Sequence, residues 1–292
     1  MGIFFIIKMS HKNILVNSLK ESFKSIWKNK LLFTFLFILQ VIFFVTISFL
    51  TLEYTTKILG GAIAISDYLS QQKLDDVSVA DNILQKKSIL GDDPLSISRN
   101  FSDMVKNFRI YLIYLFILLV AFLSLVWSLT CNFIYEKKNS SFHAMTKNFF
   151  KGAVVLMFYL GIIFLFLLLV FNVSLTGIAI EGINLFTKYT PLLIFSIILV
   201  YFMFISLSLV HKVELKNIVR ETLRIGIKKI HYMLTVYFIN ISLISMPIIS
   251  LIYFFEINSL GNSPAILASF IIFIFSFIFV RIFMVKVVEK LV

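Results

Sequence analysis

The sequence predicts an all-α integral membrane protein whose six transmembrane helices form three repeated units, each an amphipathic cytoplasmic helix followed by a transmembrane hairpin. Hydrophobic residues make up 60% of the 292 residues and charged residues only 14%, whereas soluble domains are about half apolar and about a quarter charged. With 34 Phe residues, a water-soluble fold would expose far too much apolar surface. This composition, six apolar blocks and an internal repeat together support the fold class.

Six apolar blocks account for the transmembrane helices. Each has about the 20 residues that a helix rising 1.5 Å per residue needs to cross a hydrocarbon core of about 30 Å, and helices satisfy their backbone groups internally at that depth. The blocks are Leu31–Leu52, Ile110–Phe133, Ala153–Leu175, Pro191–Val210, Ile230–Phe255 and Pro264–Val288. The earlier run Gly2–Ile7 is too short for a signal-peptide core. We therefore expect residues 1–292 to form a single membrane domain that retains its first span.

The distribution of Lys and Arg predicts the orientation. Of the 27 basic residues, 19 fall in residues 1–30, in the connections after the second and fourth blocks, and at the end of the last block. Because basic residues concentrate on the cytoplasmic side, we expect a multi-pass cell-membrane protein with both termini in the cytoplasm. Topology then explains the net charge of +12. No nucleic-acid-binding module accompanies that charge, so we expect no nucleic-acid partner.

Two short alignments define an internal repeat. Residues 17–28 align with residues 217–228 at an offset of 200, and residues 22–29 align with residues 141–148 at an offset of 119. Each copy directly precedes an apolar hairpin, so chance is a poor explanation for both alignments. The predicted units cover about residues 12–130, 131–211 and 212–292.

The first unit carries an outer insertion at about residues 54–109. Apolar residues continue at helical spacing past both adjoining spans, so we expect the spans to extend beyond the membrane as an antiparallel pair joined through about residues 71–93. Asp93 and Pro94 are typical of a helix start. A helix running from there to Tyr135 would be roughly 60 Å long, about twice the hydrocarbon thickness.

The repeated cytoplasmic helix is amphipathic. In the first copy Leu15, Leu19 and Phe23 recur at helical spacing, with Lys residues on the opposite face. This pattern is typical of a helix in the headgroup layer, where each basic side chain adds about 1 kcal/mol of attraction to anionic lipid. The expected lipid-facing basic residues are Lys20, Lys24, Lys28, Lys147, Arg220, Arg224 and Lys228. Three interpretations remain open, namely an elbow that sets the angle of the next span, a docking site for an unknown cytosolic partner, and a lipid sensor.

The opening of the repeat, Ser22–Lys30 with its match Ser141–Lys151, resembles that of six-span prokaryotic membrane-protein families of unknown function. Those families are loosely similar to the membrane domain attached to some glycerophosphodiester phosphodiesterases. The resemblance covers the whole membrane portion and implies a fold. It implies no phosphodiesterase activity, because the chain has no room for that catalytic domain.

Residues suited to catalysis or metal binding are scattered. The four His residues are isolated, unlike the paired ligands of intramembrane metalloproteases, and Cys131 is the only cysteine. His211 and His231 flank one loop, where a solvated role is preferred over a metal site. No glycine-rich phosphate loop or nucleophile motif occurs. We therefore expect no enzymatic activity, no catalytic or metal-binding residue and no cofactor.

Few polar residues lie deep in the spans. The repeat offsets bring Gln40, Tyr159 and Asn240 to equivalent positions, so we expect a polar cluster near a pseudo-threefold axis or, alternatively, hydrogen bonds within each hairpin. Pro247 is expected to kink the fifth span. Arg281 is expected to snorkel to the cytoplasmic face.

Two function classes fit these expectations. The first is a non-enzymatic multi-pass membrane protein that acts as a scaffold or as a module binding a partner or lipid. The alternative is a transporter or permease component for a small neutral or amphipathic solute. The charge-free middles of the spans argue against ion-coupled transport.

Overall fold

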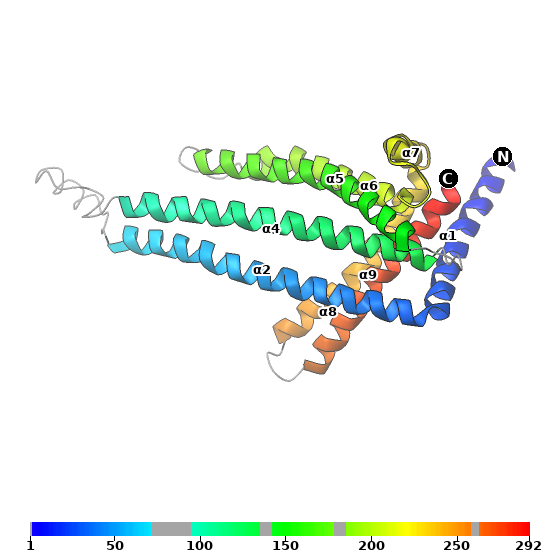
Figure 1. The fold of residues 1–292 in the computed structure, drawn as a ribbon, viewed down its shortest axis with the longest axis horizontal. Helices are drawn as coiled ribbons and strands as arrows, with labels where there is room; N and C mark the ends of the chain where they lie inside the picture. The colour runs from blue at the N-terminus through cyan, green and yellow to red at the C-terminus, as the bar shows by residue number, and fades with distance from the viewer. Residues whose placement is uncertain (1, 72–94, 135–141, 178–184, 258–262) are drawn as a thin grey trace, which may run out of the picture. The chain divides into compact units, whose positions relative to one another are not determined.

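The computed structural model describes residues 2–71, 95–134, 142–177, 185–257 and 263–292, and the regular structure in these ranges is helical (Figure 1). The described helices are α1 (Gly2–Lys28), α2 (Lys30–Gln71), α4 (Leu95–Ile134), α5 (Phe142–Gly177), α6 (Leu185–Leu209), α7 (Leu215–Lys228), α8 (Ile230–Ile257) and α9 (Ser263–Leu291). Six of them, α2, α4, α5, α6, α8 and α9, are long and apolar enough to cross a membrane. This confirms the prediction of an all-helical protein with six spans.

Helices α2 and α4 are longer than a bilayer requires. They contain 42 and 40 residues, so each is about 60 Å long, about twice the hydrocarbon thickness. This confirms the predicted extension of both spans. The helix start predicted at Asp93 and Pro94 and nearly all of the predicted connection lie outside the described residues.

The described residues divide into two compact units, and the smaller one, residues 44–119, contains the extensions of α2 and α4. Thr51 Oγ1 lies 3.2 Å from the hydroxyl of Tyr111. Further along the pair, a β-carbon built on Gly61 would lie 3.3 Å from the backbone oxygen of Asn100. From the first contact to the second, the residue number rises on α2, from 51 to 61, and falls on α4, from 111 to 100. The two helices are therefore antiparallel, as predicted.

The larger unit, residues 1–43 with 120–292, is organised around α9. Helix α9 packs against α8, α1 and α6, helix α5 packs against α6, and α7 lies on α6 and α8. Ser250 and Ser269 share a hydrogen bond of 2.8 Å that fixes the antiparallel register of α8 and α9. The completely buried side chains of the core include Leu36, Leu156, Ile205, Leu207, Leu209, Met233, Ile274, Ile278 and Phe283.

The first and third repeat units share a helix break at equivalent positions. Helix α1 ends one residue before Asn29 and α7 one residue before Lys229, which is the offset of 200 found in the sequence. At both breaks the backbone N–H still bonds four residues back, from Asn29 to Ser25 (3.1 Å) and from Lys229 to Ile225 (2.9 Å). In these two units the predicted boundary helix is therefore a separate helix that turns directly into a span.

The middle unit differs from the prediction. Helix α5 runs without interruption from Phe142 to Gly177, so the predicted boundary helix and the following span are one helix. His143, Ala144 and Lys147 in its first two turns are exposed. Ser128 of α4 donates to the backbone oxygen of Met145 in these turns at 2.8 Å, whereas α1 is packed on α9 and α7 on α6.

Candidate functional site

Helix α7 presents three different faces along its 14 residues. Its buried residues are Ile218, Thr222, Ile225 and Gly226. A stripe of apolar side chains is exposed beside them, at Leu215, Val219, Leu223 and Ile227. One residue after each apolar position stands a cation, at Lys216, Arg220, Arg224 and Lys228. Exposed apolar side chains next to a row of cations are the pattern that a helix at a membrane surface requires.

Helix α7 is held against α6 by close contacts near its end. Gly226 lies so close to α6 that a β-carbon at this position would approach Cε1 of Phe202 to 2.6 Å. The hydroxyl of Tyr201 donates to the backbone oxygen of Gly226 at 2.8 Å. The exposed stripe is therefore presented by a helix that is fixed to the bundle.

A buried chain of hydroxyls extends the attachment of α7 to α5. Ser206 Oγ on α6 lies 2.9 Å from Thr222 Oγ1 on α7 and donates to the hydroxyl of Tyr159 on α5 at 3.0 Å. All three residues are buried. Since Ser206 has a single proton, Thr222 must donate to it, and each bond secures a group that would be costly to bury alone.

Helix α1 repeats the arrangement of α7. Ser18 and Ser22 are completely buried, and they are the repeat equivalents of the buried residues Ile218 and Thr222 at the offset of 200. The apolar side chains of Phe23 and Trp27 are 51% and 76% exposed, and each is followed by a lysine. The third exposed lysine of this face is Lys20. The repeat therefore preserves which face is buried and which is exposed.

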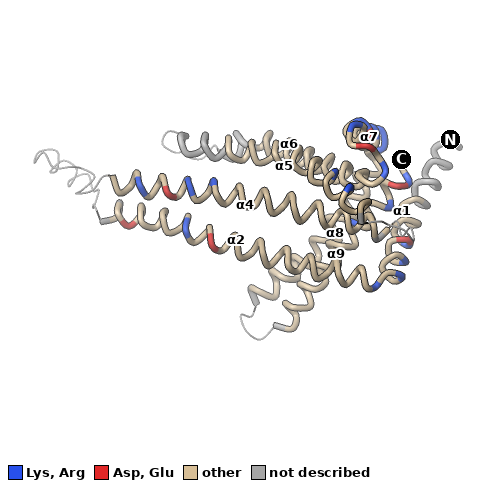
Figure 2. Tube along the Cα trace, in the orientation of Figure 1, with Lys and Arg blue, Asp and Glu red and all other residues tan. Residues whose placement is uncertain are grey.

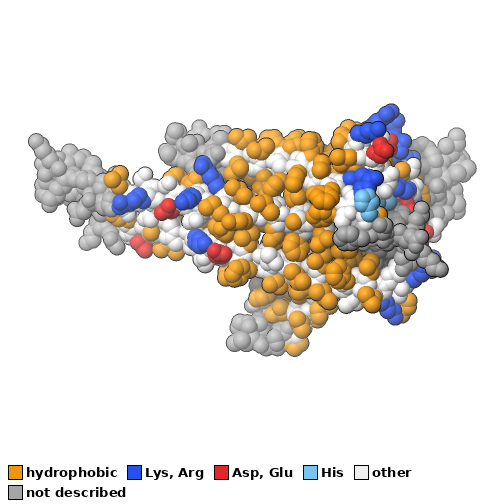
Figure 3. All heavy atoms as spheres, viewed as in Figure 1, with side chains coloured by type: hydrophobic (Ala, Val, Ile, Leu, Met, Phe, Trp, Pro, Cys, Tyr) orange, Lys and Arg blue, Asp and Glu red, His pale blue; other side chains and the backbone are white. Residues whose placement is uncertain are grey.

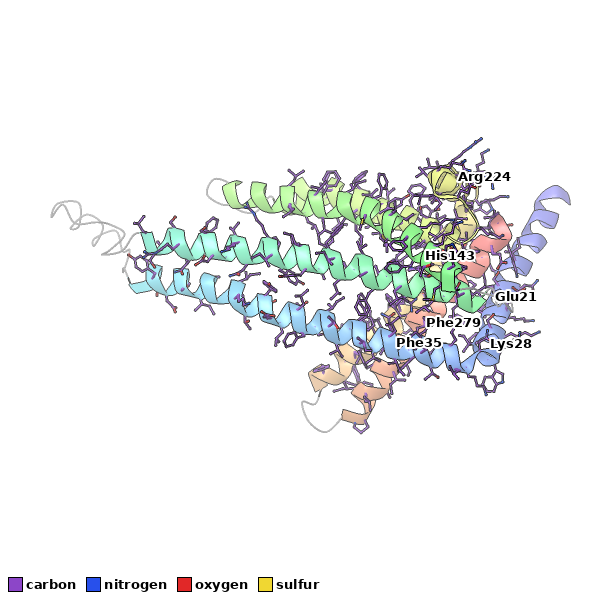
Figure 4. All side chains as sticks on the ribbon, in the orientation of Figure 1. Glu21, Lys28, Phe35, His143, Arg224 and Phe279 are labelled. Carbon is purple, nitrogen blue, oxygen red and sulfur yellow. The ribbon has the colours of Figure 1, made fainter. Side chains whose placement is uncertain are left out.

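Two contacts attach α1 to α9. The rings of Phe23 and Phe279 lie 4.6 Å apart, and Lys290 Nζ donates to Glu21 Oε1 at 2.8 Å. Figure 4 shows Glu21 and Lys28 along α1, with Phe279 on the neighbouring α9 and Arg224 on α7. Lys and Arg gather on α7, on the described part of α1 and at the end of α9, while apolar side chains dominate the rest of this unit's visible surface (Figures 2 and 3). We call this part of the larger unit the basic end.

The first turns of α5 also belong to the basic end. His143, Lys147 and Lys151 recur every four residues and line a groove of about 560 Å³ together with the exposed Phe150 and with Leu215 of α7. Basic and apolar side chains are again adjacent here, although the first turns of α5 are continuous with the span rather than a separate boundary helix.

Lys151 connects α5 to the end of α6. Its Nζ donates to the backbone oxygens of Val210 at 3.3 Å and Val213 at 3.0 Å, just beyond the end of α6. Carbonyl groups at a helix C-terminus lack intrahelical partners and carry partial negative charge, which a lysine satisfies well.

His211 lies among these cations. Burial lowers the pKa of its imidazole to about 4, and the nearby charges of Lys212, Lys151 and Lys286 contribute in the same direction. The histidine is therefore neutral at physiological pH. In the part of the chain that the structure describes, no group of three or more His, Cys, Asp or Glu side chains is placed to hold a metal ion.

The three predicted intramembrane residues Gln40, Tyr159 and Asn240 are all buried. Tyr159 bonds to Ser206 of its hairpin partner, which is the alternative that the sequence left open for it. Among the described residues no hydrogen bond joins any two of the three, and the polar cluster stays a prediction. Pro247 is buried within α8, which continues through it from Ile230 to Ile257, and its kink also stays a prediction.

The expectation that Arg281 snorkels is wrong. Arg281 is only 4% exposed, and its guanidinium lies over the ring of Phe277 at 5.6 Å. The short distance from Arg281 to the end of the span suggested a free path to water, but α9 packs against α1, α6 and α8. A single sequence carries no signal for which neighbours cover a given helix face.

No protein-family model, curated protein or solved structure matches the chain. The similarity to the membrane domain of some phosphodiesterases therefore rests on the repeat motif alone.

Proposed function

We propose that this multi-pass protein is a non-enzymatic membrane module whose boundary helices bind anionic lipid headgroups and so form a scaffold at one membrane face. The observation that carries the proposal is the surface shared by α1 and α7, where exposed apolar side chains are followed directly by cations. In α1 these pairs are Phe23 with Lys24 and Trp27 with Lys28. Apolar side chains enter the interface while the cations meet the headgroups at about 1 kcal/mol each.

The orientation that we propose places the basic end in the cytoplasm. Both α1 and the end of α9 belong to it, so both termini would lie on that side. Its support is that 19 of the 27 basic residues fall in the sequence segments expected on the cytoplasmic side. The cytoplasmic leaflet is also the one rich in anionic lipid, so orientation and lipid binding support the same role.

The experiment compares thermal stability in two nanodisc compositions, pure phosphatidylcholine and phosphatidylcholine with phosphatidylglycerol. We expect anionic lipid to raise the Tm of the unsubstituted protein, and we expect this increment to fall when Arg220, Arg224 and Lys228 are all replaced by Gln. A matched control replaces Lys57, Arg99 and Lys106 with Gln, which removes the same charge from the smaller unit. The proposal fails if both variants lose the increment equally, because the effect then depends on net charge alone.

A second candidate, a transporter or permease component for a small neutral or amphipathic solute, is supported by one specific observation. Both polar side-chain atoms of Gln40 and the side-chain oxygen of Asn240 are buried without a hydrogen-bond partner among the described residues. Polar groups of this kind inside a span are costly and often contact a solute. Uptake of a candidate solute into proteoliposomes that is lost in both Gln40→Leu and Asn240→Leu would favour this function.

A further inference from the structure

Arg281 is a buried cation without a counter-charge among the described residues. All three nitrogens of its guanidinium are buried, and within the described ranges they have neither a hydrogen-bond partner nor an ion pair. Its helical neighbours on the same face are Ile274, Ile278 and Val285, which are completely buried. The side chain therefore points into the core of the larger unit.

An unpartnered charge in this position is energetically expensive. Burying an isolated cation costs several kcal/mol, and a charged side chain inside a membrane bundle usually marks a functional site. The contact with the ring of Phe277 offsets only part of this cost, since such contacts contribute about 2 kcal/mol when desolvated. Five N–H donors remain to be satisfied.

A second buried polar group lies near Arg281. The bond between Ser250 and Ser269 sets the antiparallel register of α8 and α9. Asn240 lies ten residues before Ser250 on α8, and Phe279 lies ten residues after Ser269 on α9, so these two residues are at about the same level of the antiparallel pair. Arg281 follows Phe279 by two residues and is therefore about level with Asn240. The side-chain oxygen of Asn240 is buried and has no partner among the described residues.

Aromatic contacts lead from Asn240 to a third unpartnered group. Tyr237 lies one turn before Asn240, and its ring centroid is 6.4 Å from that of Phe204 on α6. The ring centroid of Phe204 is in turn 6.1 Å from that of Trp127 on α4. The indole nitrogen of Trp127 is buried and has no partner in the part of the chain that the structure describes.

Gln40 of α2 approaches the same region. The ring of Phe43, nearly one turn after Gln40, has its centroid 5.2 Å from that of Phe122 on α4. Phe122 precedes Trp127 by about one and a half turns. The amide of Gln40 is likewise buried and without a partner among the described residues. Four helices thus direct unpartnered polar groups into one core, and three of these groups contain N–H donors.

We propose that Arg281 is the anion-binding residue of a ligand site inside the bundle, and that the site holds the carboxylate or phosphate headgroup of an anionic amphiphile. A guanidinium pairs with two oxygens of such a group at once, and the unpartnered N–H groups of Trp127 and Gln40 are further donors for it. The surrounding Ile and Phe side chains accept the ligand's apolar chain. A purely aqueous anion would gain nothing from this apolar environment.

This site does not depend on the lipid-facing role of α1 and α7. It rests on buried groups of the core, whereas the boundary helices act through exposed ones. The variant that replaces Arg220, Arg224 and Lys228 with Gln therefore keeps the core site, and a failure of either proposal is distinguishable from a failure of the other.

The test uses the full-length protein purified in a neutral detergent and measures its Tm with four additives. These are a long-chain fatty acid, a lysophosphatidic acid, a neutral monoacylglycerol of the same chain length, and free acetate with inorganic phosphate. Ligand at about one hundred times its Kd is expected to raise the Tm by about 5–10 °C. Organic extracts of the purified protein are analysed in parallel by mass spectrometry, because a retained ligand would mask the shift.

We expect at least one anionic amphiphile to raise the Tm or to be retained in the extract, and the neutral analogue to do neither. Arg281→Met abolishes the effect, while Arg281→Lys weakens it at least about tenfold because a lysine cannot bind both oxygens at once. Trp127→Phe weakens binding without a change in charge, because it removes the indole N–H and keeps an aromatic ring. The control Lys106→Gln, which removes an exposed cation of the smaller unit, leaves the effect intact.

Three outcomes would overturn the proposal. The first is the absence of both a shift and a retained ligand, which would leave these groups satisfied by water. The second is an equal effect of the neutral analogue. The third is an equal effect of acetate or inorganic phosphate, which would indicate an aqueous anion. If Arg281→Met does not fold, Arg281→Lys and Trp127→Phe decide the question by the same criteria.

Discussion

Ser206 Oγ of α6 and Thr222 Oγ1 of α7 lie 2.9 Å apart in a buried contact. Because Ser206 also donates to Tyr159 of α5, this one hydroxyl joins the hairpin α5–α6 to the boundary helix α7. The exposed stripe of α7 is thereby positioned through a chain of three hydroxyls rather than by apolar packing alone.

We expect Ser206→Ala to lower the free energy of unfolding by about 1–3 kcal/mol, because it leaves the hydroxyls of Thr222 and Tyr159 buried and unpaired. Thermal or denaturant unfolding in nanodiscs measures the change. Thr235→Ala is the control, since Thr235 is exposed and bonds only to the backbone oxygen of His231 in its own helix. Equal losses in both variants would show that the hydroxyl chain has no special role.

Substitution of Gly226 measures how much the stability of the protein depends on the close approach of α7 to α6. We expect Gly226→Ala to destabilise the protein by about 1–2 kcal/mol, because its β-carbon would lie 2.6 Å from Cε1 of Phe202 and overpacking outweighs the gain in helix propensity. Gly161→Ala is the matched control, since a β-carbon there meets nothing within 4 Å, and it should stabilise by up to about 1 kcal/mol. The measurement is the midpoint of unfolding.

A second substitution checks the cause of this effect. Phe202→Leu removes the ring carbon that Gly226→Ala would approach, so the combination of the two should cost less than the sum of the single changes. Strict additivity would mean that the clash is not the reason why Gly226 is needed.

The pH dependence of stability should report on His211. The fold holds its pKa at about 4, below the value of about 6.5 of an unfolded histidine, so it favours the neutral form. The corresponding stability is fully present above about pH 6.5 and is lost as the pH falls toward 4. We expect a loss on the order of 1–2 kcal/mol between pH 7 and pH 5.

Unfolding curves of His211→Gln across this range provide the check, because the variant should be much less sensitive to pH. His231→Gln serves as the control, since that histidine is exposed on α8. A pH dependence that persists in His211→Gln and disappears in His231→Gln would assign the effect to the wrong residue and refute this account.

The sequence predicts the parts of this fold that depend on local properties. The length and apolar content of each block predict the six spans, and the stripe that continues beyond Leu52 predicts the long helical pair. The repeat predicts equivalent behaviour around residues 17–28 and 217–228, and the breaks at Asn29 and Lys229 follow it.

The remaining features depend on contacts between helices that are distant in sequence. Arg281 is buried because α9 packs against other helices. Lys151 donates a hydrogen bond to the backbone oxygen of Val213, which lies 62 residues later in the sequence. The continuous helix α5 has the same origin, since its residues resemble those of α1 but its first turns contact Ser128 of α4 rather than packing on α9 as α1 does. Gly226 alone carried a local signal, because a glycine within an amphipathic helix often marks a close approach.

The proposed orientation allows a test that needs no purified protein. Of the 27 basic residues, 19 lie in or beside the four segments assigned to the cytoplasm, and this imbalance sets membrane topology. Reporter fusions after residues 140 and 215 should therefore show cytoplasmic activity, and fusions near residues 80 and 185 should show activity on the opposite side.

A control variant separates charge from hydrophobicity as the determinant of this topology. Substitution of the exposed Lys216, Arg220, Arg224 and Lys228 by Gln leaves the apolar spans unchanged but weakens the positive-inside signal of one loop. A fusion after residue 229, which contains all four positions, should report partial loss of the cytoplasmic signal in this variant, with no change at residue 140. A cytoplasmic signal at residue 80 in the unsubstituted protein would be incompatible with six membrane crossings, because residue 80 would then lie on the same side as the N-terminus.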